Sequence, residues 1–250
     1  MLQTKENPMW IAEQGILIGA VRHNDRSSVA RIFTRTHGMV PFIWFMSKSG
    51  RNASRNTLLQ PLTHLEFQAE YVPTENLHHI KEAKNSLPYR EIPFNPQKSA
   101  IALFLSEFLT HSLRSEQNNP GLYTFLTESL RWFDNAPDGS YANFHIAFMI
   151  GTASHIGVCP NSDEYTPGAV LDMRDGCFTP LTPLHSDYMP AELSYKLNLL
   201  MNSSYDEIKD APLTGQERVT LLNSLNNYFR LHIPAFPVLK SIEILETVFG

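Results

Sequence analysis

The sequence predicts an α+β fold in which a small β-barrel precedes a helical domain. Residues 10–72 contain short apolar or alternating segments joined by turn-forming clusters, as the strands of a small barrel do. After Pro73 the apolar residues recur at helical spacing instead. Prolines at positions 73, 88, 93 and 96 mark the change of period. We therefore expect a barrel domain over residues 1–76 and a helical domain over residues 77–250.

The first region contains strand-like segments at 15–21, 29–35, 39–46 and 58–72. Turn clusters rich in Asn, Asp, Ser or Gly separate the first three, and glycines in the first suit a β-bulge. Segment 29–35 alternates, so Arg31, Phe33 and Arg35 are expected on one face. Four or five strands over this length indicate a closed or partly open barrel.

Amphipathic stripes predict helices over 97–116, 120–133, 140–157, 190–201 and 214–232. Thr214 and Glu217 have the spacing of a capping box, which places the start of the fifth helix. A last helix is expected to start near Pro237, and segment 158–189 is expected to be irregular. The apolar stripes are interpreted as core rather than as a cofactor site.

Charge is distributed unevenly along the chain. The net charge is −5, but residues 1–60 hold 8 basic and 3 acidic side chains, and the other 190 residues hold 12 and 22. A basic segment in an acidic chain suits a polyanionic partner such as nucleic acid. A solvated surface with no partner is the alternative interpretation.

The sequence shows no sign of a membrane span or a secretion signal. No apolar run approaches about 18 residues. The first ten residues include Glu6 and lack an apolar core segment. The two cysteines are too few for a disulfide framework, so a reducing compartment is expected, with the cytoplasm as the location.

Enzymatic motifs are absent from the sequence. It contains no phosphate-binding loop, no His-Glu-x-x-His and no Gly-x-Ser-x-Gly. Cys159 and Cys177 do not open Cys-x-x-Cys pairs, since Ser162 and Pro180 occupy the second positions. One alternative function remains open, a metal-dependent hydrolase that uses His155, Cys159, Cys177 and His185.

Nucleic-acid binding is the hypothesis that the basic residues favour. Sequence-independent contact with phosphates needs several cations on one surface, with aromatic side chains beside them on which unpaired bases stack. The aromatic residues of the strands have core packing as their alternative role. The expected DNA contacts are Arg22, Arg26, Arg31, Arg35, Lys48, Arg51 and Arg55.

Four strings of the sequence are distinctive when they are taken in order. The amino-terminal string is EQGILIGAVRHNDRSSVARIFTRTHGMVPFI, and the carboxyl-terminal one is YFRLHIPAFPVLKSIEILETVF. Between them lie SKSGRNASRNTLLQPLTHLEF and FHIAFMIGTASHIGVCPN. The ordered set resembles the bacterial DNA repair protein RecO family, and the resemblance covers both ends and the middle of the chain.

The resemblance implies an N-terminal OB-fold barrel, a helical C-terminal domain and no catalysis. Members of the family bind single- and double-stranded DNA, anneal complementary strands and help RecR load the RecA recombinase. They also bind the acidic tail of the single-stranded DNA-binding protein, and RecF is a further candidate partner. Some members hold zinc with four cysteines. This chain keeps two at most, so no metal is expected in segment 158–189.

Three further expectations concern the second half of the chain. Arg230, His232 and Lys240 are expected to be structural, with a partner-binding patch as the alternative. The acidic helical domain is expected to bind protein partners, with a local basic pocket near Arg131 or Lys196 for the acidic tail. A protein-interaction scaffold without any DNA binding is the remaining alternative.

Overall fold

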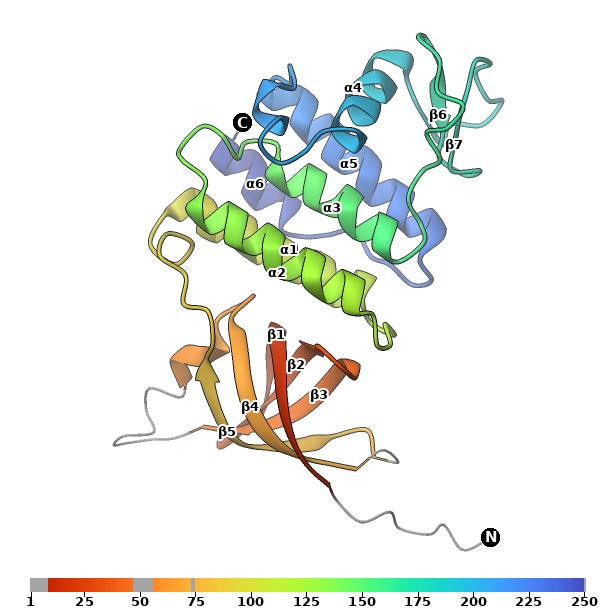
Figure 1. The fold of residues 1–250 in the computed structure, drawn as a ribbon. Helices are drawn as coiled ribbons and strands as arrows, with labels where there is room; N and C mark the ends of the chain where they lie inside the picture. Colours follow the sequence, from red (N-terminus) through yellow and green to blue (C-terminus); the bar gives the residue numbers. More distant parts are fainter. Residues whose placement is uncertain (1–8, 47–55, 73–74, 250) are drawn as a thin grey trace, which may run out of the picture. The chain divides into compact units, whose positions relative to one another are not determined.

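The computed structural model describes residues 9–46, 56–72 and 75–249. The chain divides into two compact units. The first comprises Met1–Tyr89 and Leu113–Tyr123, and the second comprises Arg90–Ser112 and Thr124–Gly250. Strands dominate the first unit and helices the second, which confirms the predicted fold class (Figure 1).

Five strands of the first unit close into a barrel. Their order around it is β1-β2-β3-β5-β4. All neighbours are antiparallel except β3 and β5, which run parallel. The strands are β1 (Met9–Asn24), β2 (Ser27–Thr34), β3 (Gly38–Phe45), β4 (His64–Tyr71) and β5 (His78–Asn85).

Strand β1 serves two neighbours because it is 16 residues long. Its first half pairs with β4, from Met9 opposite Tyr71 to Ile16 opposite His64. Its second half pairs with β2, with a register shift between Leu17 and Gly19. The expected bulge in this segment is therefore present, and it bends the strand from one side of the barrel to the other.

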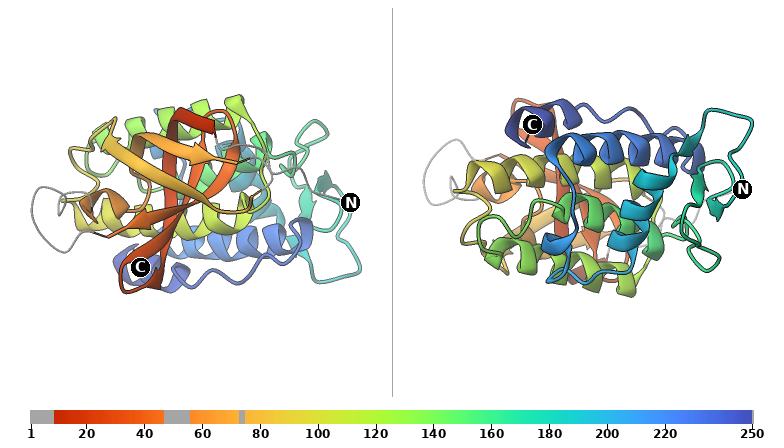
Figure 2. Two further views of the ribbon diagram at one scale, coloured as in Figure 1. Left: turned by 90° about the horizontal axis from the view of Figure 1, so that it is seen from below. Right: turned by 90° about the horizontal axis from the view of Figure 1, so that it is seen from above.

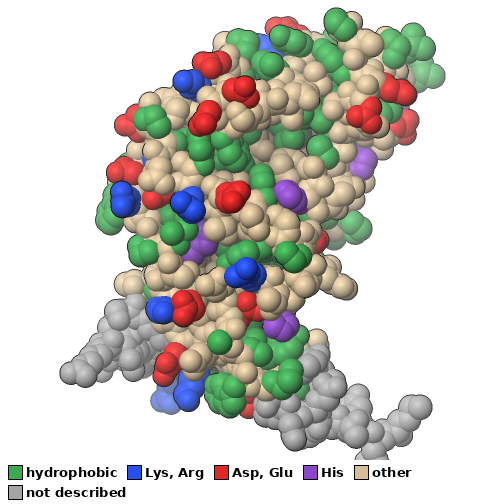
Figure 3. Space-filling view, viewed as in Figure 1, with side chains coloured by type: hydrophobic (Ala, Val, Ile, Leu, Met, Phe, Trp, Pro, Cys, Tyr) green, Lys and Arg blue, Asp and Glu red, His purple; other side chains and the backbone are tan. Residues whose placement is uncertain are grey.

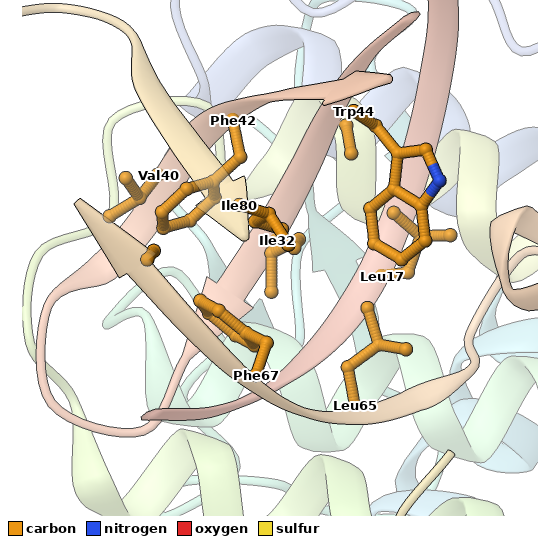
Figure 4. Close-up of a cluster of buried hydrophobic side chains, with 10 residues drawn as sticks. Leu17, Ile32, Val40, Phe42, Trp44, Leu65, Phe67 and Ile80 are labelled. Carbon is orange, nitrogen blue, oxygen red and sulfur yellow. The ribbon is translucent and has the colours of Figure 1, made fainter. Parts of the chain in front are cut away.

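The interior of the barrel is a cluster of buried apolar side chains from all five strands (Figure 4). Phe42 and Phe67 meet edge to face there, with ring centroids 5.1 Å apart. Because side chains fill the barrel, ligands have access only to its outside and its loops. The labelled members are Leu17, Ile32, Val40, Phe42, Trp44, Leu65, Phe67 and Ile80.

The barrel unit also contains residues 113–123, which follow the first helix and include the first turn of the second. The amide of Met39 donates to the carbonyl of Glu116 at 2.9 Å. The ring of Tyr123 lies 6.4 Å from that of Phe33, whose side chain is fully buried. Residues 113–123 therefore cover part of the outer surface of β2 and β3.

Strand β5 lies beyond the domain boundary that we expected at residue 76. His78 and Ile80 are buried, and β5 pairs with both β3 and β4. The first unit therefore continues to Tyr89, whose hydroxyl donates to the carbonyl of Leu62 at 2.7 Å. The strand was missed because its sequence, HHIKEAKN, is polar at most positions.

The second unit is built of six helices, drawn in Figures 1 and 2. Helices α1 and α3 end or begin a few residues inside the expected ranges 97–116 and 140–157, and α2 ends two residues later than expected. None of the helices in the described ranges is both long and apolar enough to cross a bilayer. The helices are α1 (Pro96–Ser112), α2 (Pro120–Asn135), α3 (Phe144–His155), α4 (Ala191–Met201), α5 (Gly215–His232) and α6 (Ile242–Phe249).

Polar side chains fix the start of the second unit. The carboxylate of Asp134 accepts hydrogen bonds from the amides of Arg90, Glu91 and Ile92 at 2.8 to 2.9 Å. The buried Lys98 ammonium donates to the carbonyls of Asp134 and Ala136, at 2.9 and 2.8 Å. Both contacts lie at the carboxyl end of α2, where a cation is favourable.

The expected irregular segment 158–189 contains a small sheet of its own. Its strands are β6 (Val170–Asp172), β7 (Cys177–Thr179) and β8 (Tyr188–Met189), in the order β7-β6-β8. The Ser194 hydroxyl of α4 accepts from the amide of Leu171 at 2.8 Å and donates to the carbonyl of Met189 at 2.9 Å. These bonds attach the sheet to α4.

We predict that Gly38→Ala destabilises the barrel unit by about 2 kcal/mol or more. Gly38 has a φ of +71°, and an added Cβ would lie 2.5 Å from backbone atoms of Glu116 and Gln117. Gly139→Ala is the matched control, because Gly139 has a φ of +84° but nothing within 4 Å of the added Cβ. Urea unfolding measures both. Equal losses in the two variants would show that contact with residues 113–123 is unimportant.

We also predict that the free energy of unfolding decreases as the pH is lowered below 6.5. Burial lowers the pKa of His145 on α3 to about 3, with the charge of Arg218 as a second cause. Burial likewise lowers the pKa of His64 on β4 to about 4. Protons then bind mainly to the unfolded chain, so each group costs about 1.4 kcal/mol per pH unit below 6.5 until its folded-state pKa is reached.

The measurement is the free energy of unfolding at pH 7 and pH 5, for the wild type and for His145→Asn. The variant should show the shallower pH dependence, whatever its absolute stability. An unchanged dependence would mean that His145 is not held neutral by the fold.

Candidate nucleic-acid interface

The hairpin between β1 and β2 presents two of the expected DNA contacts. Arg22 and Arg26 are exposed, and the Asn24 side chain accepts from the Arg26 amide at 2.8 Å, which builds the turn. Arg22 forms an exposed ion pair with Asp25 at 2.6 Å. Within the described ranges Arg26 has no such acidic partner. Arg26 is therefore the less neutralised of the two cations.

Arg31 lies on the outer surface of the barrel, at the middle of β2. Its neighbours across the sheet are Gly19 on β1 and Pro41 on β3, neither of which has a long side chain to cover it. Phe33 shares its face but is fully buried against Tyr123. The face predicted for Arg31, Phe33 and Arg35 exists, but Phe33 packs as core and cannot stack on a base.

Arg35 lies at the other end of the barrel from the hairpin. It follows β2, and its amide donates to the carbonyl of Gln14 at 2.8 Å. The eight residues of β2 separate it from the hairpin, a distance of roughly 25 Å. The candidate cations in the described ranges therefore follow β2 rather than forming one cluster.

The other three candidate contacts, Lys48, Arg51 and Arg55, lie outside the described residues. Met46, the last residue described before them, donates its amide hydrogen to the carbonyl of Arg26 at 2.8 Å. The chain therefore leaves β3 directly beside the β1–β2 hairpin.

The outer surface of β4 and β5 is more acidic. Glu66, Gln68 and Glu82 are exposed there, and Lys84 is paired with Glu66 at 3.0 Å. On the side of the molecule in Figure 3, Lys and Arg side chains alternate with Asp and Glu instead of forming one basic patch. Phosphate contacts are therefore expected on the β1–β2–β3 side of the barrel.

Several barrel residues that could contact nucleic acid were not foreseen. The most exposed aromatic side chains of the unit are Trp10 at 63% and Phe45 at 52%. Arg114, in the segment that covers β2 and β3, is an additional exposed cation. The sequence did indicate that Phe45 faces outward, because it alternates along β3 with the inward residues and shares the outward face with Met39, Pro41 and Ile43.

The four residues of the hydrolase hypothesis do not form a metal site. Cys159 and Cys177 both lie near Tyr228, whose hydroxyl donates to the carbonyl of Val158 at 2.9 Å. His155 packs on Phe125 instead, with ring centroids 4.9 Å apart, and His185 pairs with Asp172 at 3.2 Å. The described residues include no group of three or more His, Cys, Asp or Glu side chains that could hold a metal ion.

The surroundings of the cysteines also disfavour thiolates, which are the form that binds zinc. Burial raises the pKa of Cys159. Burial and then the charges of Asp175, Asp172 and Glu164 raise the pKa of Cys177. A cavity of about 530 Å³ adjoins Cys159 and His155, and its other walls come mainly from α3, from residues 160–163, and from the end of α4 and the residues after it.

One of the two residues suggested for a tail-binding pocket is unsuitable. The Lys196 ammonium is mostly buried, is bound to the Glu217 carboxylate and lies 3.7 Å from Glu192. Arg131 on α2 is exposed. Next to it in sequence, Trp132 lines a cavity of about 390 Å³ together with Tyr205 and Lys209.

Part of the carboxyl-terminal motif makes structural contacts, whereas Arg230 is exposed on α5. His232 hydrogen-bonds to a carbonyl at 2.7 Å, although the acceptor is Met173 and not a residue near Pro234. The amides of Lys240 and Ser241 donate to Glu107 of α1 at 3.0 and 2.9 Å, and the Ser241 hydroxyl donates to the same carboxylate. The Lys-Ser pair thus joins the start of α6 to α1.

Comparison with known proteins agrees with this architecture. Residues 9–89 match the family model described as Recombination protein O N terminal, and residues 93–167 match Recombination protein O C terminal. The first match and the first segment of the barrel unit both end at residue 89.

Full-length relatives are similar over almost the whole chain. The DNA repair protein RecO of Phocaeicola vulgatus is 39% identical over 94% of this chain and 98% of its own length. The corresponding proteins of Bacteroides fragilis and Porphyromonas gingivalis are 37% and 36% identical, over 94% and 96% of this chain and 97% and 100% of their own lengths. The chain therefore belongs to the RecO family of DNA repair proteins.

Proposed function

We propose that this chain is a recombination mediator that binds single- and double-stranded DNA without sequence specificity. In this role it anneals complementary strands and helps load a recombinase onto protein-coated single-stranded DNA. The observation that carries the proposal is the family membership, together with a closed barrel whose β1–β2 hairpin exposes Arg22 and Arg26.

Annealing needs no bond-breaking chemistry, which agrees with a non-enzymatic role. Two DNA strands repel each other through their phosphates, and a protein that neutralises part of that charge lowers the cost of their encounter. Arg22, Arg26 and Arg31 would supply this charge, together with Lys48, Arg51 and Arg55. Arg35, at the far end of β2, would contribute only if the strand followed the whole of β2.

The two units differ in net charge, which supports separate binding roles for them. The barrel unit holds 11 basic and 8 acidic residues, a net charge of +3, and the helical unit holds 9 and 17, a net charge of −8. DNA would therefore bind mainly to the barrel, and protein partners to the helical unit. The proposed partners are RecR, the single-stranded DNA-binding protein and RecF, in the cytoplasm at the nucleoid.

Among the described residues, those that line the cavity beside Trp132 are the most suitable to bind an acidic tail with an apolar end. Trp132 and Tyr205 stack with ring centroids 5.2 Å apart and provide aromatic walls. Lys209 lines the same cavity and is exposed. One apolar pocket with a neighbouring cation suits a peptide that ends in an aromatic residue and a carboxylate.

The salt dependence of DNA affinity tests the phosphate contacts. For single strands, each phosphate contact adds about 0.7 to the slope of log affinity against log salt. Arg26→Ala with Arg31→Ala should therefore flatten the slope by about 1.4, and Lys48→Ala, Arg51→Ala and Arg55→Ala together by about 2. Fluorescence anisotropy with a labelled oligonucleotide measures the slope at several salt concentrations.

Arg230→Ala is the matched control, because Arg230 is an exposed cation on α5. Its slope should equal that of the wild type. Equal slopes in all variants would remove the hairpin and the 47–55 segment from the DNA site. No binding by the wild type at any salt concentration would favour the scaffold alternative.

Binding of the acidic tail is tested with a labelled peptide that carries several Asp residues and a terminal Phe. Lys209→Gln should weaken binding about 3-fold to 10-fold, the range of one exposed charge-assisted contact. Lys84→Gln, which changes an exposed lysine of the barrel unit, is the control. Equal affinities for the two variants would place the tail elsewhere.

A further inference from the structure

One edge of the barrel carries exposed aromatic side chains that core packing does not use. Trp10 on β1 is 63% exposed and Phe45 on β3 is 52% exposed. His79 on β5 is also exposed. Single exposed apolar residues are common on protein surfaces, so their exposure alone indicates nothing. Their arrangement is what distinguishes them.

The three rings lie along one line of paired positions across the sheet, with Glu70 between Trp10 and His79. Trp10 is paired with Glu70 on β4, Glu70 is paired with His79 on β5, and His79 is paired with Ile43 on β3. Phe45 lies two residues beyond Ile43 on the same outward face. Its ring stacks on that of His79, with centroids 6.0 Å apart and an interplanar angle of 15°. The rings therefore form a row across β1, β4, β5 and β3.

A cation completes the row at its β1 end. The Lys81 ammonium lies 5.0 Å from the centroid of the Trp10 ring, in cation–π contact. Gln68 pairs with Glu82 and Ala69 pairs with Ile80, so Lys81 is the extra residue of a bulge in β5. Such bulges often redirect a side chain at a functional surface.

The row also adjoins the candidate phosphate site. Phe45 is paired with Ser27, next to the β1–β2 turn. The amide of Met46 bonds to the carbonyl of Arg26 at 2.8 Å. A strand whose phosphates contact Arg26 would therefore pass its next bases over Phe45 and His79.

Charge decides which part of the nucleic acid can face this row. Glu70 lies between Trp10 and His79, Glu75 precedes β5, and Glu82 lies within β5. These carboxylates outnumber the Lys81 ammonium, so they disfavour phosphates at close range. Unpaired bases are uncharged and stack on aromatic rings, whereas the bases of a duplex are already stacked on each other.

We propose that Trp10, His79 and Phe45 form a stacking row for the bases of single-stranded DNA. The row extends from the arginine-bearing hairpin to Lys81. The inference rests on the proposed DNA-binding function and adds to it the side chains that prefer a single strand over a duplex.

The test compares two labelled oligonucleotides of equal length, oligo(dT) and an abasic strand with the same phosphates. The full-length wild type should bind oligo(dT) about 10-fold or more tightly than the abasic strand, since stacking contributes strongly per base. Trp10→Ala with Phe45→Ala should lose most of this preference. Their affinity for the abasic strand and their salt slope should not change.

Two further variants keep the result interpretable. Tyr195→Ala removes an aromatic side chain that is 49% exposed on α4, and it should behave as wild type. Trp10→Phe keeps a ring, so it should keep most of the preference for bases. It should also lose the quenching of tryptophan fluorescence that base stacking on Trp10 would cause in the wild type.

The outcomes separate the stacking row from the function that it extends. Salt-dependent binding with no difference between the two strands, or a preference that survives in the double variant, would overturn the row and leave the proposed function standing. No binding of either strand by the wild type would overturn both.

Discussion

The parallel pairing of β3 with β5 is the constraint on which the functional surface depends. It consists of two residue pairs, Phe42 with His78 and Ile43 with His79, and it closes the barrel. Without it, β5 would be attached only to β4, and His79 would not reach Phe45. The buried pair of Phe42 and His78, with ring centroids 5.7 Å apart, supports this short junction from the interior.

Closure has the further effect of filling the barrel, so that function is confined to its outer surface. The long strand β1 connects the two sides, because its first half carries Trp10 and its second half leads to Arg22 and the hairpin. In the proposed complex, phosphates and bases would meet different parts of one surface. The arginine side would neutralise charge, and the aromatic edge would receive bases that have left a duplex. A strand held in the proposed way would have its charge reduced while some of its bases stayed apart from a partner strand, so that base pairing could be tried repeatedly.

The sequence predicted the order of the two halves, most element positions and the capping box of α5, because these depend on local periodicity and local hydrogen bonds. Thr214 and Glu217 bond reciprocally as their spacing required. It did not predict β5, whose pairing partners supply the stability that its polar sequence lacks. The sequence also did not show that Phe33 is covered whereas Phe45 is exposed. Both point outward from the barrel, but Phe33 is covered by residues 113–123, a contact that only the tertiary fold creates.

The candidate cations were foreseen as a set, but their division along β2 was not, since one-dimensional spacing does not show which end of a strand meets which loop.

The most direct test of the account is photochemical crosslinking of a single strand that contains 5-iododeoxyuridine, followed by mass spectrometry of the full-length protein. The account predicts crosslinks at Trp10, His79 or Phe45, on the edge of the barrel beside the β1–β2 hairpin. Crosslinks confined to the helices of the second unit would contradict it.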